Sequence, residues 1–82
     1  MTLSQAKMGD LLRVVAVDSA QAEIGERLCA LGIFPGVDLQ LLHRAPLGDP
    51  LQVKAGRTLV SIRRREADFV SVALAAGYEA VS

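Results

Sequence analysis

The sequence is poor in several features on which small proteins often depend, and each shortage excludes a class of protein. It has one cysteine, Cys29, no tryptophan and only 4% aromatic residues. A single cysteine cannot form an intramolecular disulfide, and a secreted domain of this size usually needs several. The N-terminal residues lack the apolar core of a signal peptide, and no apolar run approaches the roughly 20 residues that span a bilayer. These shortages predict a cytoplasmic protein.

An excess of either charge is also missing. Nine basic residues balance nine acidic ones, which gives a formal net charge of zero. Domains that bind nucleic acid usually carry a basic excess, because binding to phosphates releases counterions. Bases of single strands stack on aromatic side chains, and no aromatic residue lies among the basic residues 63–65. We therefore expect no nucleic-acid partner.

The groups needed for catalysis or metal binding are sparse. No nucleophile, base and charge stabiliser form a recognisable set, and the glycines lack the lysine-terminated pattern of a phosphate loop. His43, the only histidine, shares the core-facing phase of its expected strand, so we expect a strand residue with one ring nitrogen hydrogen-bonded. Cys29 and His43 are expected on different elements and are too few for a transition-metal site. We expect no catalytic residue, no cofactor site and no metal site.

What the sequence does contain is enough apolar residues for one packed domain. The 82 residues are 51% hydrophobic and 22% charged, which is typical of a globular chain. We expect a single domain over residues 1–82, with a core from about 8 to 73 and a fraying tail over 74–82. The mean hydropathy of +0.34 is high for a small domain and suggests apolar surface for a partner.

The first half of the chain reads as a strand followed by a helix. Aliphatic and β-branched residues predict a strand over 11–17, and Asp18 or Ser19 is a suitable cap for a helix over 20–31. Asp18 and Gln21 have the spacing of a capping box. The core stripe of this helix is expected to contain Ala20, Ile24, Leu28 and Leu31.

A glycine and a proline turn follow the expected helix. Gly32 should end the helix in the left-handed conformation, which glycine adopts without a Cβ clash. Pro35 and Gly36 then predict a tight turn into the next strand.

The second half of the chain reads as a series of short strands. Alternation predicts a strand over 37–44, and the prolines and glycine of 45–50 predict a structured loop. A hairpin over 51–55 and 58–63 should turn at Gly56 and Arg57, and a last strand is expected over 69–72. The expected inward residues of the hairpin are Leu51, Val53, Val60 and Ile62.

Five short strands and one helix predict a mainly β fold, a small SH3-like or OB-like β-barrel. Three segments also resemble the FeoA family in the same order along the chain. They are the helix end LCALGIFPG, the loop APLGDPLQV and the strand exit LVSIRRREADFVSV. The resemblance covers about residues 8 to 73 and implies that the barrel is of the SH3-like kind, with about five strands.

The resemblance implies a function that composition alone does not. FeoA proteins are non-enzymatic accessory proteins of ferrous iron uptake, so the implied partner is the cytoplasmic part of the FeoB membrane transporter. The chain would then support or regulate that transporter at the inner face of the membrane. Two alternatives remain open: an SH3-like regulatory domain related to the C-terminal domain of iron-dependent repressors, and a self-assembling structural module.

Two surfaces are candidates for contact with a partner. On the expected helix, Ala22, Gly25 and Cys29 form a side of small residues that would let another backbone approach, and Phe34 could extend it. Packing under the domain's own loops or tail is the alternative for this side.

The second candidate surface is the triple arginine of residues 63–65, and Arg63 and Arg64 are the residues in it that we expect to contact a partner. An acidic patch on a protein would be its target. The alternative is a solvated turn in which these arginines pair locally with Glu66 and Asp68.

Overall fold

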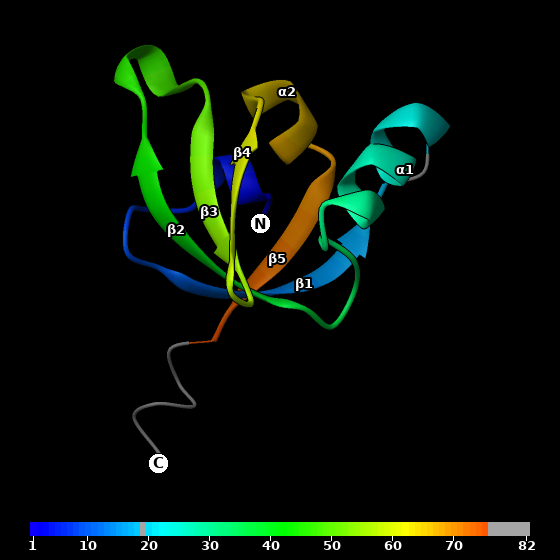
Figure 1. Ribbon diagram of the computed structural model, residues 1–82, viewed down its shortest axis with the longest axis horizontal. Coiled ribbons are helices and arrows are strands. Elements are labelled where there is room, and N and C mark those ends of the chain that lie inside the picture. The colour runs from blue at the N-terminus through cyan, green and yellow to red at the C-terminus, as the bar shows by residue number, and fades with distance from the viewer. Residues whose placement is uncertain (19, 76–82) are drawn as a thin grey trace.

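The computed structural model describes residues 1–18 and 20–75. Its strands form one five-stranded antiparallel sheet in the order β4-β3-β2-β1-β5 (Figure 1). The expected mainly β fold is therefore confirmed. In chain order, the elements are η1 (Leu3–Gln5), β1 (Leu11–Val17), α1 (Ala22–Ala30), β2 (Asp38–Arg44), η2 (Pro46–Gly48), β3 (Leu51–Ala55), β4 (Thr58–Ile62), α2 (Arg64–Ala67) and β5 (Val70–Leu74).

The helix α1 begins later than the sequence suggested. Its N-cap is Gln21, which makes no side-chain capping bond, so the expected capping box between Asp18 and Gln21 is wrong. Instead, Oδ1 of Asp18 accepts a hydrogen bond from the backbone N–H of Ala20 at 2.9 Å. This local side-chain bond holds a turn ahead of the helix. Ala20 is consequently exposed rather than part of the core stripe.

The end of α1 is as expected. Gly32 has a φ of +90°, and its N–H donates to the carbonyl of Cys29 at 3.0 Å. The N–H of Ile33 donates to the carbonyl of Leu28 at 2.9 Å, which completes a Schellman motif. Ile33 and Leu28 are both buried, so this helix end is tied into the core.

A β-bulge in β2 changes the phase that the sequence suggested for His43. Leu39 and Leu41 are buried as expected, but the register against β3 shifts between Leu41 and His43. The extra residue is Leu42, and an extra residue reverses the faces of those that follow it. His43 is therefore exposed, so the core-facing phase expected for it is wrong, and no described residue is hydrogen-bonded to its ring.

The β3–β4 hairpin is confirmed in its turn and in its inward face. Gly56 and Arg57 form the turn, and the four expected inward residues are all buried. The segment that follows forms the short helix α2 rather than a plain turn, and β5 runs over Val70–Leu74 rather than 69–72.

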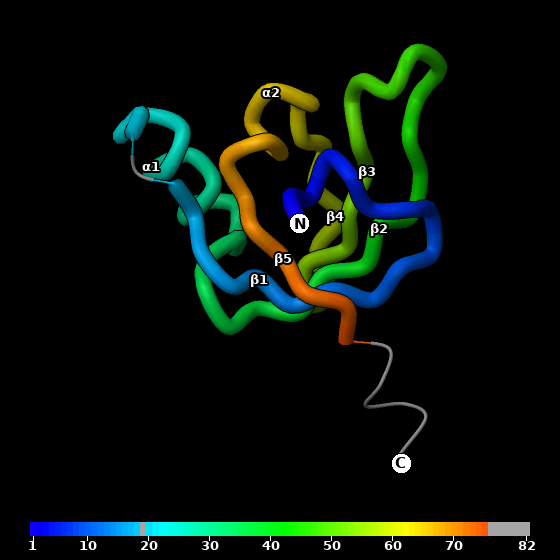
Figure 2. The backbone as a smooth tube through the Cα atoms, turned by 180° about the vertical axis from the view of Figure 1, so that it is seen from behind, coloured from blue at the N-terminus to red at the C-terminus, as the bar shows by residue number. Residues whose placement is uncertain are grey.

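The core extends further toward the N-terminus than residue 8. Leu3 and Ala6 are buried, and the N–H of Val72 donates to the carbonyl of Met1 at 2.8 Å. Figure 2 shows this N-terminal segment beside β5. A domain with few residues to bury gains apolar contact by including its N-terminal segment in the core. Residues 76–82 of the expected tail lie outside the described residues.

Candidate partner-binding surfaces

The small-residue side of α1 is open to solvent. Ala22 and Cys29 are exposed, and a Cβ added at Gly25 would meet nothing within 4 Å. No described loop therefore covers this side, which argues against internal packing by those loops. Phe34, in the turn after the helix, is 46% exposed.

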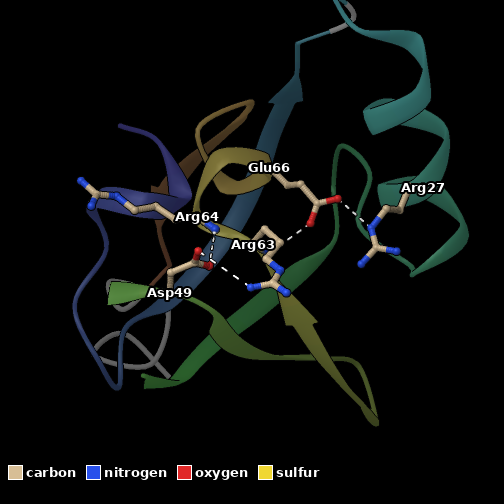
Figure 3. Close-up of polar contacts among 5 residues, drawn as sticks. All are labelled: Arg27, Asp49, Arg63, Arg64 and Glu66. Carbon is tan, nitrogen blue, oxygen red and sulfur yellow. Dashed lines mark hydrogen bonds and ion pairs between the residues drawn. The ribbon is translucent and has the colours of Figure 1, made fainter. Parts of the chain in front are cut away.

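An ion pair fixes the position of α1 over the sheet. The carboxylate of Glu66, on α2, is buried, and its Oε2 accepts a hydrogen bond from Nε of Arg27 at 2.6 Å (Figure 3). The other oxygen, Oε1, accepts the backbone N–H of Arg63 at 3.0 Å. Both oxygens of a buried carboxylate are thus satisfied, as burial of a charge requires. The pair gives α1 a defined place relative to α2.

Among the described residues, the side chains of the triple arginine 63–65 form no ion pair with Glu66 or Asp68. Glu66 is engaged by Arg27 on another helix, and Asp68 accepts a hydrogen bond from the hydroxyl of Ser4. The expectation of local pairs with Glu66 and Asp68 is therefore wrong. The two carboxylates instead accept hydrogen bonds from Arg27 and Ser4, which are distant in the sequence and are brought close by the fold.

Asp49, from the β2–β3 loop, is the carboxylate that meets this cluster instead. Its Oδ1 accepts the backbone N–H of Arg64 at 3.1 Å, and its Oδ2 lies 4.0 Å from Nη1 of Arg63 (Figure 3). Within residues 1–18 and 20–75, the guanidinium groups of Arg64 and Arg65 have no partner. The cluster thus presents two unpaired cations beside the loop 45–50.

That loop carries a side chain that sequence reasoning missed. Leu47 is 98% exposed and has a φ of 70° inside η2. A signal was available in the sequence: an aliphatic residue between prolines and glycine in a connecting loop has little to pack against, since loops run over the surface. Loop 45–50 and α2 lie at the top of Figure 1, and Asp49 joins them through the N–H of Arg64.

The described residues lack a clustered set of metal ligands, and one depression lies on β3 and β4. They contain no group of three or more His, Cys, Asp or Glu residues able to hold a metal ion. A depression of about 160 Å³ is lined by Gln52, Leu59, Val60 and Ser61. Ligand pockets are usually about 300 to 1,000 Å³. None of the described helices has the length and apolar character needed to cross a membrane.

Comparison with known proteins decides the family. The FeoA domain model matches residues 1–74. The chain belongs to the FeoA family. Proteins of this family are non-enzymatic accessory proteins of Fe(2+) transport, and this chain is one of them.

Relatives of this FeoA protein cover nearly its whole length. A Helicobacter pylori protein provisionally named Fe(2+) transport protein A is 29% identical over 88% of this chain and 95% of its own. The solution structure of FeoA from Chlorobium tepidum is 40% identical, with a TM-score of 0.83, over 94% of this chain and 72% of its own. FeoA of Stenotrophomonas maltophilia, a procaryotic SH3 domain protein crystallised with zinc, is 33% identical, with a TM-score of 0.77, over 89% of each chain. These likenesses confirm the expected SH3-like fold.

The fold also occurs in metal-dependent repressors. A manganese-dependent transcriptional repressor solved with manganese has a TM-score of 0.84 and 19% identity, and the match covers 90% of this chain and 36% of the repressor. At that identity, the likeness shows a shared fold alone.

Proposed function

We propose that this FeoA protein binds the cytoplasmic part of a FeoB-type ferrous iron transporter and supports or regulates it from the cytoplasm. The observation that carries the proposal is the family match over residues 1–74. An accessory protein of Fe(2+) transport that has no catalysis of its own acts through contact with another component. The membrane transporter is the component that moves the ion.

The small-residue side of α1 is the first candidate contact. Ala22 and Cys29 are exposed, and the open space at Gly25 allows a partner backbone to approach closely. Phe34 adds a half-exposed aromatic ring of the kind that often anchors interfaces. Contact through this side should depend little on ionic strength, because few charges take part.

Arg63 and Arg64 are the second candidate contact. The guanidinium of Arg64 has no partner among residues 1–18 and 20–75, and that of Arg63 is 4.0 Å from Asp49. Exposed cations attract an acidic surface, and salt screens that attraction over about 10 Å at 0.1 M. Binding through the arginines should therefore weaken steeply as salt rises.

The test is direct binding of the purified chain to the full-length transporter of the same organism in nanodiscs. Cys29→Arg places bulk and charge on the helix side, and Cys29→Ser is the matched control that keeps the size. We expect Cys29→Arg to bind at least about tenfold more weakly, as hot-spot positions do, with an unchanged melting temperature.

Each outcome of this test has a separate meaning. A stable Cys29→Arg variant that binds like the parent would place the interface away from α1. A Cys29→Arg variant that melts well below the parent would show that this helix side belongs to the core. A parent chain that does not bind the transporter would overturn the proposed function.

A regulatory domain is the second candidate function, because the fold is shared with the manganese-dependent repressor. The family match favours the accessory role. Self-assembly is the third candidate, and the molar mass in solution tests it: a monomer at micromolar concentration would exclude a stable homo-oligomer.

A further inference from the structure

Leu47 has a conformation that its own side chain does not explain. Its φ of 70° lies in the left-handed region, which residues with a Cβ rarely occupy and which leucine enters at a cost in energy. Its side chain is 98% exposed, so it gains no packing inside the domain. A single exposed leucine is common on protein surfaces, but non-glycine residues held in the left-handed region cluster at ligand clamps and switch regions.

The loop around Leu47 is braced from both sides. The N–H of Ala45 donates to the carbonyl of Pro50 at 3.0 Å, which closes the base of the loop. Asp49 ties the loop to α2 through the N–H of Arg64 at 3.1 Å. Below the loop, Nη2 of Arg44 donates to the carbonyl of Ala6 at 2.6 Å. The backbone that carries Leu47 is therefore held in place before any partner arrives, which lowers the entropy lost on binding.

The short helix that contacts this loop carries cations. The loop contacts the arginine cluster 63–65 through Asp49, and the guanidinium groups of Arg64 and Arg65 have no partner among residues 1–18 and 20–75. A loop that carries an exposed apolar side chain and is hydrogen-bonded to a cationic segment complements a partner surface with an apolar pocket and acidic groups near it.

We infer that loop 45–50 and the arginine cluster form a docking surface whose anchor is Leu47, and that its occupant is an apolar, carboxylate-rimmed pocket on the cytoplasmic part of the transporter. This inference rests on the proposed function and adds a second contact to the α1 side. The positive charge of residues 63–65 favours an acidic partner surface, and the exposed side chain of Leu47 favours an apolar pocket within it.

A protein pocket fits these observations better than a lipid surface does. A bilayer accepts an apolar side chain in any orientation and does not require a fixed backbone, whereas a pocket does. One leucine and a few arginines also bind anionic lipid weakly, at about 1 kcal/mol per arginine near the surface. The strained and braced backbone is therefore explained by a partner of fixed shape.

The experiment compares Leu47→Asn with Leu59→Thr in binding to the full-length transporter in detergent. Asparagine tolerates positive φ, so Leu47→Asn removes the apolar side chain without added strain. Leu59, which is 71% exposed, lies in β4 just after the β3–β4 turn, at the opposite end of the sheet, and threonine suits a strand (Figure 1). We expect Leu47→Asn to bind at least about tenfold more weakly with an equal or higher melting temperature, and Leu59→Thr to bind within about twofold of the parent.

The acidic rim is tested by charge variants and salt. Arg64→Ala and Arg65→Ala should weaken binding in dilute buffer and make it less sensitive to salt between about 0.1 M and about 1 M. An unchanged salt dependence in both variants would exclude the acidic rim.

Three results would overturn the inference in distinguishable ways. If Leu47→Asn binds the transporter like the parent, the docking surface is wrong and the proposed function stands. If the parent chain itself does not bind, the proposed function fails and the inference fails with it. If Leu47 controls binding to mixed phosphatidylcholine and phosphatidylglycerol vesicles but not to the transporter, the surface contacts lipid instead.

Discussion

Nε of Arg27 donates a hydrogen bond across 2.6 Å to Oε2 of Glu66, a residue 39 positions further along the chain. The two side chains differ in burial: that of Arg27 is 55% exposed and that of Glu66 is 7% exposed. The pair joins the helix that carries one candidate surface to the short helix that carries the other. Because the two side chains differ in burial, we expect substitutions of Arg27 and of Glu66 to lower the free energy of unfolding by different amounts.

The first prediction follows from that asymmetry. Arg27→Met leaves a buried carboxylate without its counter-charge, and should lower the free energy of unfolding by about 1 to 3 kcal/mol, less than for a fully buried pair because water reaches this side. Glu66→Gln keeps the shape and an acceptor for the N–H of Arg63, and should cost about 0.5 to 1.5 kcal/mol. Urea unfolding of both variants measures the difference. A larger cost for Glu66→Gln would contradict this account.

The second prediction concerns two glycines that are both surrounded by open space. Gly32 has a φ of +90°, so Gly32→Val should destabilise the protein by about 1 to 3 kcal/mol through backbone strain. Gly25 lies inside α1, and Gly25→Ala should stabilise the helix by up to about 1 kcal/mol. Thermal unfolding of the two variants should give shifts of opposite sign. An unchanged melting temperature for Gly32→Val would show that the conformation at Gly32 carries no strain penalty.

The third prediction concerns pH. Nε of Arg13 donates to Oδ1 of Asp38 at 2.8 Å, and this hydrogen bond holds the pKa of the Asp38 carboxyl below its ordinary 3.8. Because the unfolded chain binds this proton more readily, the pair stabilises the fold above about pH 4, and that contribution is lost as the pH falls through the lower folded value.

Asp38→Asn should therefore lower the melting temperature slightly at neutral pH, because an exposed pair contributes little, and should match the parent at acid pH, so that its decline between about pH 5 and pH 3 is flatter. Arg13→Gln removes the same hydrogen bond from the other side and should flatten the decline as well. Melting curves over this pH range measure the effect. Variant profiles that run parallel to that of the parent would refute the assignment.

The fourth prediction concerns the brace under Leu47. Asp49→Ala removes the acceptor for the N–H of Arg64 at the start of α2, and should cost about 0.5 to 2 kcal/mol, as loss of a helix cap does. Asp49→Asn keeps an acceptor oxygen and should cost less. Thermal unfolding and amide exchange at Arg64 measure both effects. Equal stability of Asp49→Ala and the parent would show that the brace contributes nothing.

Much of this fold could be predicted from patterns among residues that are close together in the sequence. The strand over 11–17, the hairpin with its inward residues, and the positive φ of Gly32 all follow from residues within a few positions of one another. Periodicity and turn chemistry act over those short distances. The family resemblance over 8–73 was likewise visible in local motifs, and the family model confirmed it over 1–74.

The sequence by itself therefore determined the fold class, most elements and the family, while the candidate surfaces depended on tertiary structure. The bulge at Leu42 that exposes His43, the burial of Leu3, and the pairing of Glu66 with Arg27 each arise between segments distant in the chain. Composition and spacing do not specify which distant groups meet, because that depends on how the sheet closes. The position of Leu47 also depends on tertiary structure. The loop that carries it is held by the hydrogen bond between Asp49 and the N–H of Arg64, and the folded strands β3 and β4 bring these two residues together.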